Sequence, residues 1–329
     1  MGSGPVRRVL LLLAAAPAVA EDLPLIRAAG TSLDTFEVEL RLDAVDHTTA
    51  EGLAKSFARF EEEQHGVRRR FAELVRDAHL DVLRGFYAKE IVDRQAKDYD
   101  AVEQKGYRCE VTGVEAKGDK ATARILRTYI ERGKQREETS ELNFVHAGPR
   151  WDLVSIRDRA PDGRFADRGL GAPPVLKRVP VPAAAPPDLS SAKDAVTSLQ
   201  NDVLRFGALR DNASLLLTDR FFDIAAAFYG EETARKARAS RPKTEAPAPV
   251  FVEVGAGAPR LADLVRVEVT VFEEVPGRPD LRSAIGNAAF DLRPDGGKWK
   301  VVSEHLRPDP EMALSPVSGN FGLFFLVRR

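Results

Sequence analysis

The longest pattern in the sequence is a stripe of apolar residues spaced four and three positions apart. This spacing places side chains on one face of an α-helix, with polar residues over the remaining surface. Only Gln64 interrupts the stripe, and Asp46, Thr48 and Thr49 are candidate N-cap residues. The stripe consists of Leu53, Phe57, Phe60, Val67, Phe71, Leu74 and Ala78. We expect a long helix that packs on the sheet of its own repeat, with a coiled-coil partner as the alternative.

A second helical stretch, residues 78–103, is followed by four segments in which apolar and polar residues alternate. Such alternation is typical of half-buried β-strands. The segments are residues 107–116, 119–132, 135–146 and 150–158. Gly118, Gly133 and Gly148 lie between successive segments, as expected for antiparallel hairpins. One face of the second segment carries Ala121, Ala123, Ile125, Arg127 and Tyr129.

The same order of helices and strands occurs a second time. Its strand segments are residues 250–254, 263–274, 281–292 and 298–306. Each copy closes on a related phrase, Trp151-Asp152-Leu153-Val154-Ser155 or Trp299-Lys300-Val301-Val302-Ser303. Pairing Arg70-Phe71 with Arg205-Phe206 gives an offset of 135, whereas the tryptophans are 148 apart. We therefore expect about thirteen extra residues near 241–257, and Phe222 as the counterpart of Tyr87.

Proline marks the boundary between the two copies. Seven of the 21 prolines fall in residues 161–188, which predicts a semi-rigid, extended linker because proline lacks a backbone donor. The chain is therefore expected to be an α+β protein with two domains in tandem. Its parts are a signal peptide (1–20), an N-terminal extension (21–45) with an extra edge strand at 36–42, a first domain (46–160), the linker (161–188), a second domain (189–310) and an apolar tail (311–329).

The N-terminus has the three regions of an export signal. Arg7 and Arg8 precede an apolar run from Val9 to Ala16, and Ala18-Val19-Ala20 supplies the small residues of a cleavage site. The run is too short for a membrane span, which needs roughly twenty residues. We expect a periplasmic or extracellular protein with no transmembrane segment after cleavage.

Charge and cysteine content narrow the function classes. Without Arg7 and Arg8 the chain has 47 basic and 50 acidic residues, so nucleic acid is not an expected partner. Arg68-Arg69-Arg70 follows Glu61-Glu62-Glu63 and predicts a solvated, salt-bridged helix face. Cys109 is the single cysteine, which excludes an intramolecular disulfide, and its place in a strand pattern predicts a buried thiol.

The order of elements and the closing strands resemble the nuclear-transport-factor-2-like superfamily, which includes ketosteroid-isomerase-like and SnoaL-like proteins. The matching residues are Gly148 to Ser155 and Gly297 to His305. The resemblance implies two tandem cone-like domains, each with N-terminal helices packed on a curved antiparallel sheet around a pocket. Members of the superfamily use this pocket for isomerisation, cyclisation or dehydration, or for binding alone, so function transfers less readily than fold.

The candidate site residues lie in the second copy. His305 is expected on one strand face with Trp299, Val301 and Ser303, whereas the first copy has Arg157 at this position. Weak catalytic candidates are His305, Asp219, Asp223 and Tyr229, and candidate pocket-lining residues are Trp299, Ser303, Trp151 and Ser155. The alternative for His305 is a solvated residue at a strand end. The five histidines have no metal-ligand spacing, so neither metal nor cofactor is expected.

Three functions are compatible with these patterns. The first is a non-catalytic, exported protein of the cell envelope that binds an unknown protein or a small apolar ligand. The second is an enzyme of the isomerase, cyclase or dehydratase type that acts on a small apolar substrate in the second domain. The third is a structural assembly module that uses the apolar stripe and tail as contact surfaces. The first is favoured because the repeated scaffold carries no repeated polar constellation.

Overall fold

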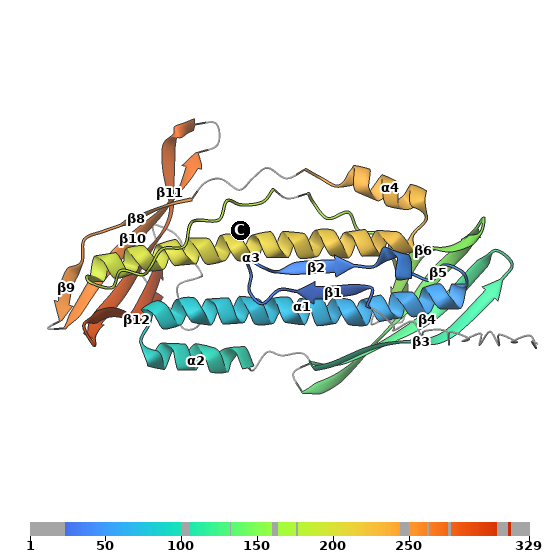
Figure 1. Ribbon diagram of the computed structural model, residues 1–329, viewed down its shortest axis with the longest axis horizontal. Coiled ribbons are helices and arrows are strands. Elements are labelled where there is room, and N and C mark those ends of the chain that lie inside the picture. Colours follow the sequence, from blue (N-terminus) through green and yellow to red (C-terminus); the bar gives the residue numbers. More distant parts are fainter. Residues whose placement is uncertain are drawn as a thin grey trace, which may run out of the picture.

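The chain has an α+β fold in which two long helices lie side by side between two antiparallel sheets (Figure 1). The computed structural model describes residues 24–100, 105–131, 133–159, 164–175, 177–243, 250–261, 263–275, 278–307 and 315–316. These residues contain four α-helices and three antiparallel sheets. The expected signal peptide, and the expected tail apart from residues 315–316, lie outside the described residues.

The two long helices, α1 (Ala50–Phe86) and α3 (Ala192–Phe228), are 37 residues each and begin in the same way. Thr49 caps α1 by accepting a hydrogen bond from the Gly52 N–H, and Ser191 caps α3 by accepting one from the Asp194 N–H. The prediction of a capped helix over the apolar stripe is therefore confirmed, with Thr49 as the cap. Both helices end at a tyrosine in extended conformation, Tyr87 or Tyr229. The short helices α2 (Lys89–Asp100) and α4 (Glu231–Ser240) follow.

Each repeat forms its own sheet. The first has the order β3-β4-β5-β6-β7, and the second has the order β13-β12-β11-β10-β8 with β9 also paired to β10. The first comprises β3 (Lys105–Lys117), β4 (Lys120–Glu131), β5 (Lys134–Ala147), β6 (Arg150–Arg159) and β7 (Phe165–Arg168). The second comprises β8 (Val250–Val254), β9 (Ala258–Leu261), β10 (Leu264–Val275), β11 (Arg278–Asp295), β12 (Lys298–Arg307) and β13 (Ser315–Pro316). The strands predicted from alternation are present, within a few residues at their ends.

Helix α1 begins at the first sheet and ends at the second. At its start, the Trp151 N–H of β6 donates to the carbonyl of His47, with a nitrogen–oxygen distance of 2.9 Å. At its end, Tyr87 forms a parallel bridge with Val301 of β12, and the Ala88 N–H donates to the Val301 carbonyl at 2.9 Å. One helix therefore connects the two sheets.

Helix α3 begins at the second sheet and ends at the first. The Trp299 N–H of β12 donates to the carbonyl of Leu189 at 3.1 Å, just before α3 begins. Tyr229, just after α3 ends, forms a parallel bridge with Leu153 of β6. The two repeats are thus interlocked: each long helix runs from the sheet of one repeat to that of the other (Figure 1), and the tyrosine that follows it bridges to the closing strand there.

The expectation that α1 packs on the sheet of its own repeat is confirmed, since Glu61 binds Arg127 of β4 and Glu62 binds the Cys109 N–H of β3. The end of the helix also reaches β12 of the other repeat.

The interlocked contacts also correct the alignment of the two copies. Thr49 matches Ser191 and Tyr87 matches Tyr229, an offset of 142 rather than 135. The pairing of Arg70-Phe71 with Arg205-Phe206 is therefore wrong by seven residues. Seven residues are nearly two helical turns, so the shifted alignment still matches apolar positions with apolar positions. Six extra residues therefore separate the helices from the closing strands. Four of them lengthen β11 to 18 residues, against 14 in β5, and shift its register at two points.

The segments outside the repeats lie along the helix pair. Strands β1 (Ile26–Ala29) and β2 (Glu37–Leu40) form a separate hairpin rather than an edge strand, and the backbone N–H groups of Leu25 and Ile26 donate to Glu63 of α1. The linker runs extended beside α3, where the Asn212 side chain exchanges two hydrogen bonds of 2.8 Å with the Val179 backbone. The first part of the predicted linker, however, is not a spacer, because residues 165–168 form β7 and pair with β6.

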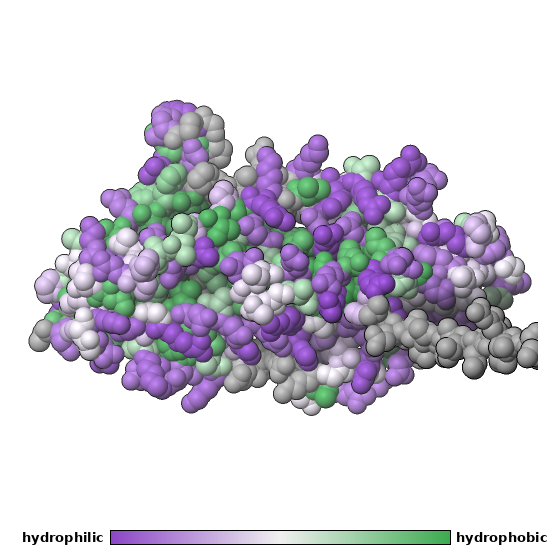
Figure 2. Space-filling model, in the orientation of Figure 1, coloured by the Kyte–Doolittle hydropathy of each residue, from purple (hydrophilic) through white to green (hydrophobic). Residues whose placement is uncertain are grey.

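Hydrophilic residues cover much of the face seen in Figure 2, and hydrophobic residues show between them over the second sheet and along the helix pair. None of the helices in the described ranges combines the length and the apolar character that a membrane span requires. The buried core is continuous along α1 and α3 and reaches both sheets. Phe228, at the end of α3, contacts the rings of Phe57 and Phe60 near the start of α1.

Candidate functional site

A β-bulge near the start of each closing strand decides which side chains face the helices. In β12, Val301 pairs with Leu292 and Ser303 pairs with Asp291, so Val302 is the extra residue. In β6, Leu153 pairs with Phe144 and Ser155 pairs with Asn143, so Val154 is the extra residue. A bulge shifts the alternation of side chains by one residue. Two successive buried residues of the strand are therefore separated by three positions instead of two. They are Leu153 with Ile156 in β6, and Val301 with Glu304 in β12.

The bulge overturns the expectation that Trp299, Val301, Ser303 and His305 share a face. Ser303 and His305 lie opposite Asp291 and Ala289, on the face turned away from Val301 and Glu304. The residue that enters the core in place of His305 is Glu304, which is 2% exposed. Strict alternation from Trp299 does not predict a buried Glu304, because it takes no account of the extra residue Val302.

His305 belongs to an ion-pair cluster on that outer face. Its Nε2 lies 3.0 Å from Asp291 Oδ2, and the Ser303 hydroxyl donates to the same oxygen at 2.9 Å. Arg266 binds Asp291 with two hydrogen bonds of 2.7 Å, and Arg260 lies 3.2 Å away. Burial raises the pKa of Asp291, but the hydrogen bonds from Arg266, Ser303 and His305 outweigh it and hold that pKa well below its usual value. The cluster therefore fixes a charged aspartate between strands.

The other three catalytic candidates do not meet His305. Asp219 pairs with Arg241, and Asp223 lies 3.8 Å from Arg238 of α4. Tyr229 follows the end of α3, beside the first sheet, whereas α3 begins at the second sheet. A helix of 37 residues is about 55 Å long, so Tyr229 and His305 lie near opposite ends of the molecule.

The four candidate pocket-lining residues form two symmetric structural pairs. Trp151 and Trp299 are partly buried against the core, and their backbones join the closing strands to the helix starts. Ser155 accepts a hydrogen bond from Asn143 at 3.1 Å, and Ser303 donates to Asp291, the residue equivalent to Asn143. All four lie outside the cavity that is described next.

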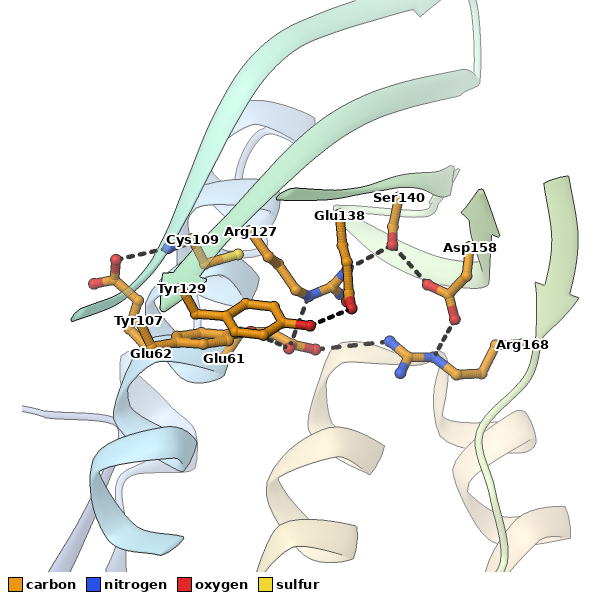
Figure 3. Close-up of polar contacts among 10 residues, drawn as sticks. All are labelled: Glu61, Glu62, Tyr107, Cys109, Arg127, Tyr129, Glu138, Ser140, Asp158 and Arg168. Carbon is orange, nitrogen blue, oxygen red and sulfur yellow. Dashed lines mark hydrogen bonds and ion pairs between the residues drawn. The ribbon is translucent and has the colours of Figure 1, made fainter. Parts of the chain in front are cut away.

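The first sheet holds an open, polar cavity of about 870 Å³ on the face that meets α1. All five strands of this sheet contribute, together with one helix residue. The residues that carry the polar network are Glu61 of α1, Tyr107 of β3, Arg127 and Tyr129 of β4, Glu138 and Ser140 of β5, Asp158 of β6 and Arg168 of β7 (Figure 3). The site lies in the first repeat, whereas the sequence directed attention to the second.

Glu61 is the centre of this network. Its carboxylate accepts hydrogen bonds from Arg127 Nε at 3.2 Å and from the Tyr107 hydroxyl at 3.3 Å. Arg168 Nη2 lies 3.7 Å from the other carboxylate oxygen. Two guanidinium groups thus converge on one carboxylate at the inner end of the cavity, as Figure 3 shows.

Arg127 is the most deeply buried charge in the cavity. Its side chain is 7% exposed, and its Nη1 donates to the Ser140 hydroxyl at 2.6 Å. Ser140 donates in turn to Asp158 at 2.6 Å, and Arg168 closes the chain by pairing with Asp158 at 3.3 Å. Arg127 Nη2 is buried and has no hydrogen-bond partner in the structure. Burial would lower the pKa of Arg127, but the attraction of Glu61 raises it overall, so the guanidinium stays charged.

Aromatic rings form one wall of the cavity. The rings of Tyr107 and Tyr129 lie 6.2 Å apart and 23° from parallel, and His65 stacks on Tyr107 at 4.5 Å. The Tyr129 hydroxyl donates to Glu138 at 2.7 Å. Burial and the nearby Glu61 raise the pKa of Tyr107 well above its usual value, and burial raises the pKa of Cys109, behind this wall, to about 12. Both groups therefore remain protonated at neutral pH.

The glutamates that precede this site depart from the predicted salt-bridged helix face. Glu61 binds Arg127, Glu62 accepts a hydrogen bond from the Cys109 N–H at 2.8 Å, and Glu63 binds the backbone before β1. Arg69 and Arg70 pair with Glu73 instead. A signal was present in the sequence, because the inner face of β4 turns from apolar to polar at Arg127. Its partners came from elements that only the folded chain brings together.

The corresponding face of the second sheet is mainly apolar. With the offset of 144 between β4 and β10, Val271 replaces Arg127, and it is fully buried. The buried polar contact there is a hydrogen bond of 3.1 Å from the Tyr87 hydroxyl to Glu304. Among the described residues, no group of three or more histidine, cysteine, aspartate or glutamate side chains is placed to hold a metal ion.

The tyrosines at the ends of α1 and α3 provide a matched test of the interlocked fold. Replacing Tyr87 with phenylalanine removes the donor to buried Glu304 and is expected to lower the free energy of unfolding by about 1–3 kcal/mol. Tyr229 is also buried, but its hydroxyl has no hydrogen-bond partner among the described residues, so Tyr229→Phe should change this energy by less than about 0.5 kcal/mol or stabilise the protein. Urea unfolding of the two variants measures the difference. Equal losses would contradict the assignment.

Comparison with known proteins yields no relatives: no family model, curated protein or solved structure matches the chain. The function must therefore be argued from the cavity and the sequence.

Proposed function

We propose that this chain is an exported, non-catalytic binding protein of the cell envelope, and that the cavity of the first sheet holds a small molecule. The observation that carries the proposal is the unpartnered Nη2 of Arg127, which is buried in the wall of an 870 Å³ cavity. A buried donor without an acceptor is costly, and native proteins rarely leave one unless a ligand or water completes it. Ligand pockets typically measure about 300–1,000 Å³, so the size also fits a small molecule.

Binding explains the protonation states in the cavity better than proton transfer does. A general acid or base works best when its pKa lies near the working pH. The pKa values of Arg127, Tyr107 and Cys109 are all raised further from neutrality, which keeps each group in one state. Arg127 and Tyr107, which line the cavity, therefore hold and orient a ligand without a change in their own protonation.

The remaining parts of the proposal come from the sequence. The basic, apolar and small-residue regions of the N-terminus support export. The order of helices and strands supports two tandem, cone-like repeats similar to nuclear-transport-factor-2-like proteins, each with its pocket between helix and sheet. In such an arrangement, the end of the long helix of one repeat would contact the closing strand of the other repeat. The polar cavity of about 870 Å³ lies in the first unit, so we assign binding to it.

A fragment screen by ligand-observed NMR on the full chain tests the proposal. We expect fragments that bind the wild-type protein and bind Arg168→Trp more weakly, because this half-exposed residue lines the cavity. A rigid indole there would remove the guanidinium and take up part of the space. Arg124→Trp is the matched control, since Arg124 lies on the opposite face of β4 and is 59% exposed. The proposal fails if no fragment distinguishes Arg168→Trp from the wild-type protein.

A further inference from the structure

The Nη2 group of Arg127 shows which kind of atom a ligand of the cavity must supply. Arg127 already uses Nε for Glu61 and Nη1 for Ser140, and within the part of the chain that the structure describes its Nη2 is buried without an acceptor. An N–H of a charged guanidinium forms its strongest hydrogen bonds with a charged oxygen, as in a carboxylate. The group that completes this site is therefore an oxygen acceptor.

The carboxylates of the cavity are already engaged. Glu61 is held by Arg127 and Tyr107, Asp158 by Ser140 and Arg168, and Glu138 by Tyr129. None of them accepts a hydrogen bond from Nη2. An oxygen that enters the cavity, from a ligand or from water, can serve as the acceptor.

Arg168 provides a second guanidinium for the same acceptor. It approaches the carboxylate of Glu61 that Arg127 also binds, so the two arginines converge within the reach of one carboxyl group. The Arg168 side chain is 49% exposed, which leaves part of its donor fork open to the cavity. Paired guanidinium donors match the two oxygens of a carboxylate, whereas an ammonium group carries only donors and cannot accept a hydrogen bond from either arginine.

The tyrosine wall indicates the body of the ligand. Tyr129 stands beside the arginines, with its hydroxyl fixed on Glu138 and its ring nearly parallel to that of Tyr107 (Figure 3). A flat aromatic ring can stack on such a wall and replace water there. An acid group at one end and a ring at the other would match the two halves of the cavity.

We propose that the cavity binds a small aromatic carboxylate, whose carboxylate accepts hydrogen bonds from Arg127 Nη2 and Arg168 and whose ring lies against Tyr129. This inference rests on the proposed binding function and specifies its ligand class. The carboxylates already present keep the local charge nearly balanced, so recognition depends on the aimed donor more than on a positive field. The carboxylate is consequently distinguished from the corresponding amide by the greater strength of its charge-assisted hydrogen bonds with the two guanidinium groups.

Three probes with the same ring and different head groups test the ligand class: phenylacetate, phenylacetamide and phenethylamine. Calorimetry on the full chain at millimolar concentrations is expected to rank phenylacetate first. Arg127→Lys, which keeps the charge but lacks Nη2, should weaken phenylacetate binding by about tenfold or more, the loss typical of a charge-assisted hydrogen bond. Arg168→Gln should also weaken it, whereas Arg124→Gln, on the outer face of β4, should leave it unchanged.

The outcomes separate the ligand class from the binding function. If phenylacetamide or phenethylamine binds as tightly as phenylacetate, or if both cavity variants bind like the wild-type protein, the carboxylate assignment is overturned while a cavity-binding protein remains. If none of the three probes binds but other fragments enter the cavity, the carboxylate assignment fails and the binding function stands. If nothing enters the cavity, water completes Arg127 and both proposals fail. Should Arg127→Lys not fold, Arg168→Gln, at a half-exposed position, decides the question.

Discussion

Replacing Phe228 with alanine is expected to lower the free energy of unfolding by about 3–5 kcal/mol, the cost of removing a buried phenylalanine from a packed core. Phe228 is the last residue of α3 and is fully buried. Its ring centroid lies 5.2 Å from that of Phe57 and 5.6 Å from that of Phe60, both on α1. The truncation would therefore open a cavity between the two repeats. Urea unfolding followed by circular dichroism measures the loss.

A matched apolar truncation on the surface provides the control. Val154 is the extra residue of the β6 bulge and is 54% exposed, so Val154→Ala should change stability by less than about 0.5 kcal/mol. A loss below about 1 kcal/mol for Phe228→Ala would mean that the ends of the long helices are not packed as described.

Cutting the linker is expected to leave one particle rather than two. A protease site placed within Ala183–Ala185, which is exposed, would separate the first repeat from the second covalently. The pieces should stay together, because α1 ends on β12 and α3 ends on β6. Light scattering after size exclusion should give the same mass for the cut and uncut proteins. Two separate particles under native conditions would contradict the interlocked arrangement.

The same arrangement predicts joint unfolding. Trp151 reports on the first sheet and Trp299 on the second, so Trp151→Phe and Trp299→Phe each leave one reporter. Fluorescence of each variant should follow that variant's circular dichroism transition, as in a two-state protein. A reporter that changes well before or after the helices would indicate sheets that unfold independently.

Much of the fold is predictable from local periodicity. The stripe from Leu53 to Ala78 defined α1, and alternation with glycine turns defined the long strands. The Trp151 and Trp299 phrases identified the closing strands β6 and β12. These patterns are local, because each depends on which residues of one segment must face a core.

The packing partners could not be predicted in this way. An apolar stripe shows that a helix buries a face, but it does not show which sheet covers it. The stripe also repeats nearly every two turns, which allowed Arg70-Phe71 to be paired with Arg205-Phe206 seven residues out of register. The non-local bridges at Tyr87 and Tyr229 settle both points.

The candidate site shows a second limit of the sequence. A bulge of one residue turned Ser303 and His305 outward and brought Glu304 into the core. The polar cavity was missed because its members come from one helix and five strands, and none forms a motif with its sequence neighbours. Only Arg127, at the end of an otherwise apolar strand face, is unusual in the sequence alone.

The linker beside α3 has a consequence for the origin of the molecule. It connects the first sheet to the start of α3, so it must travel along nearly the whole helix before the second repeat begins (Figure 1). Without the linker, the same contacts between helices and sheets would join two separate chains, each consisting of one repeat and related to the other by a twofold axis. A chain of one repeat would expose the end of its helix and the open side of its sheet, and a second copy would cover both. The molecule thus has the architecture of a twofold dimer whose subunits are joined in one polypeptide, with each helix packed on its own sheet and reaching the other sheet at its end. Its two halves are free to diverge, as Arg127 and Val271 have done.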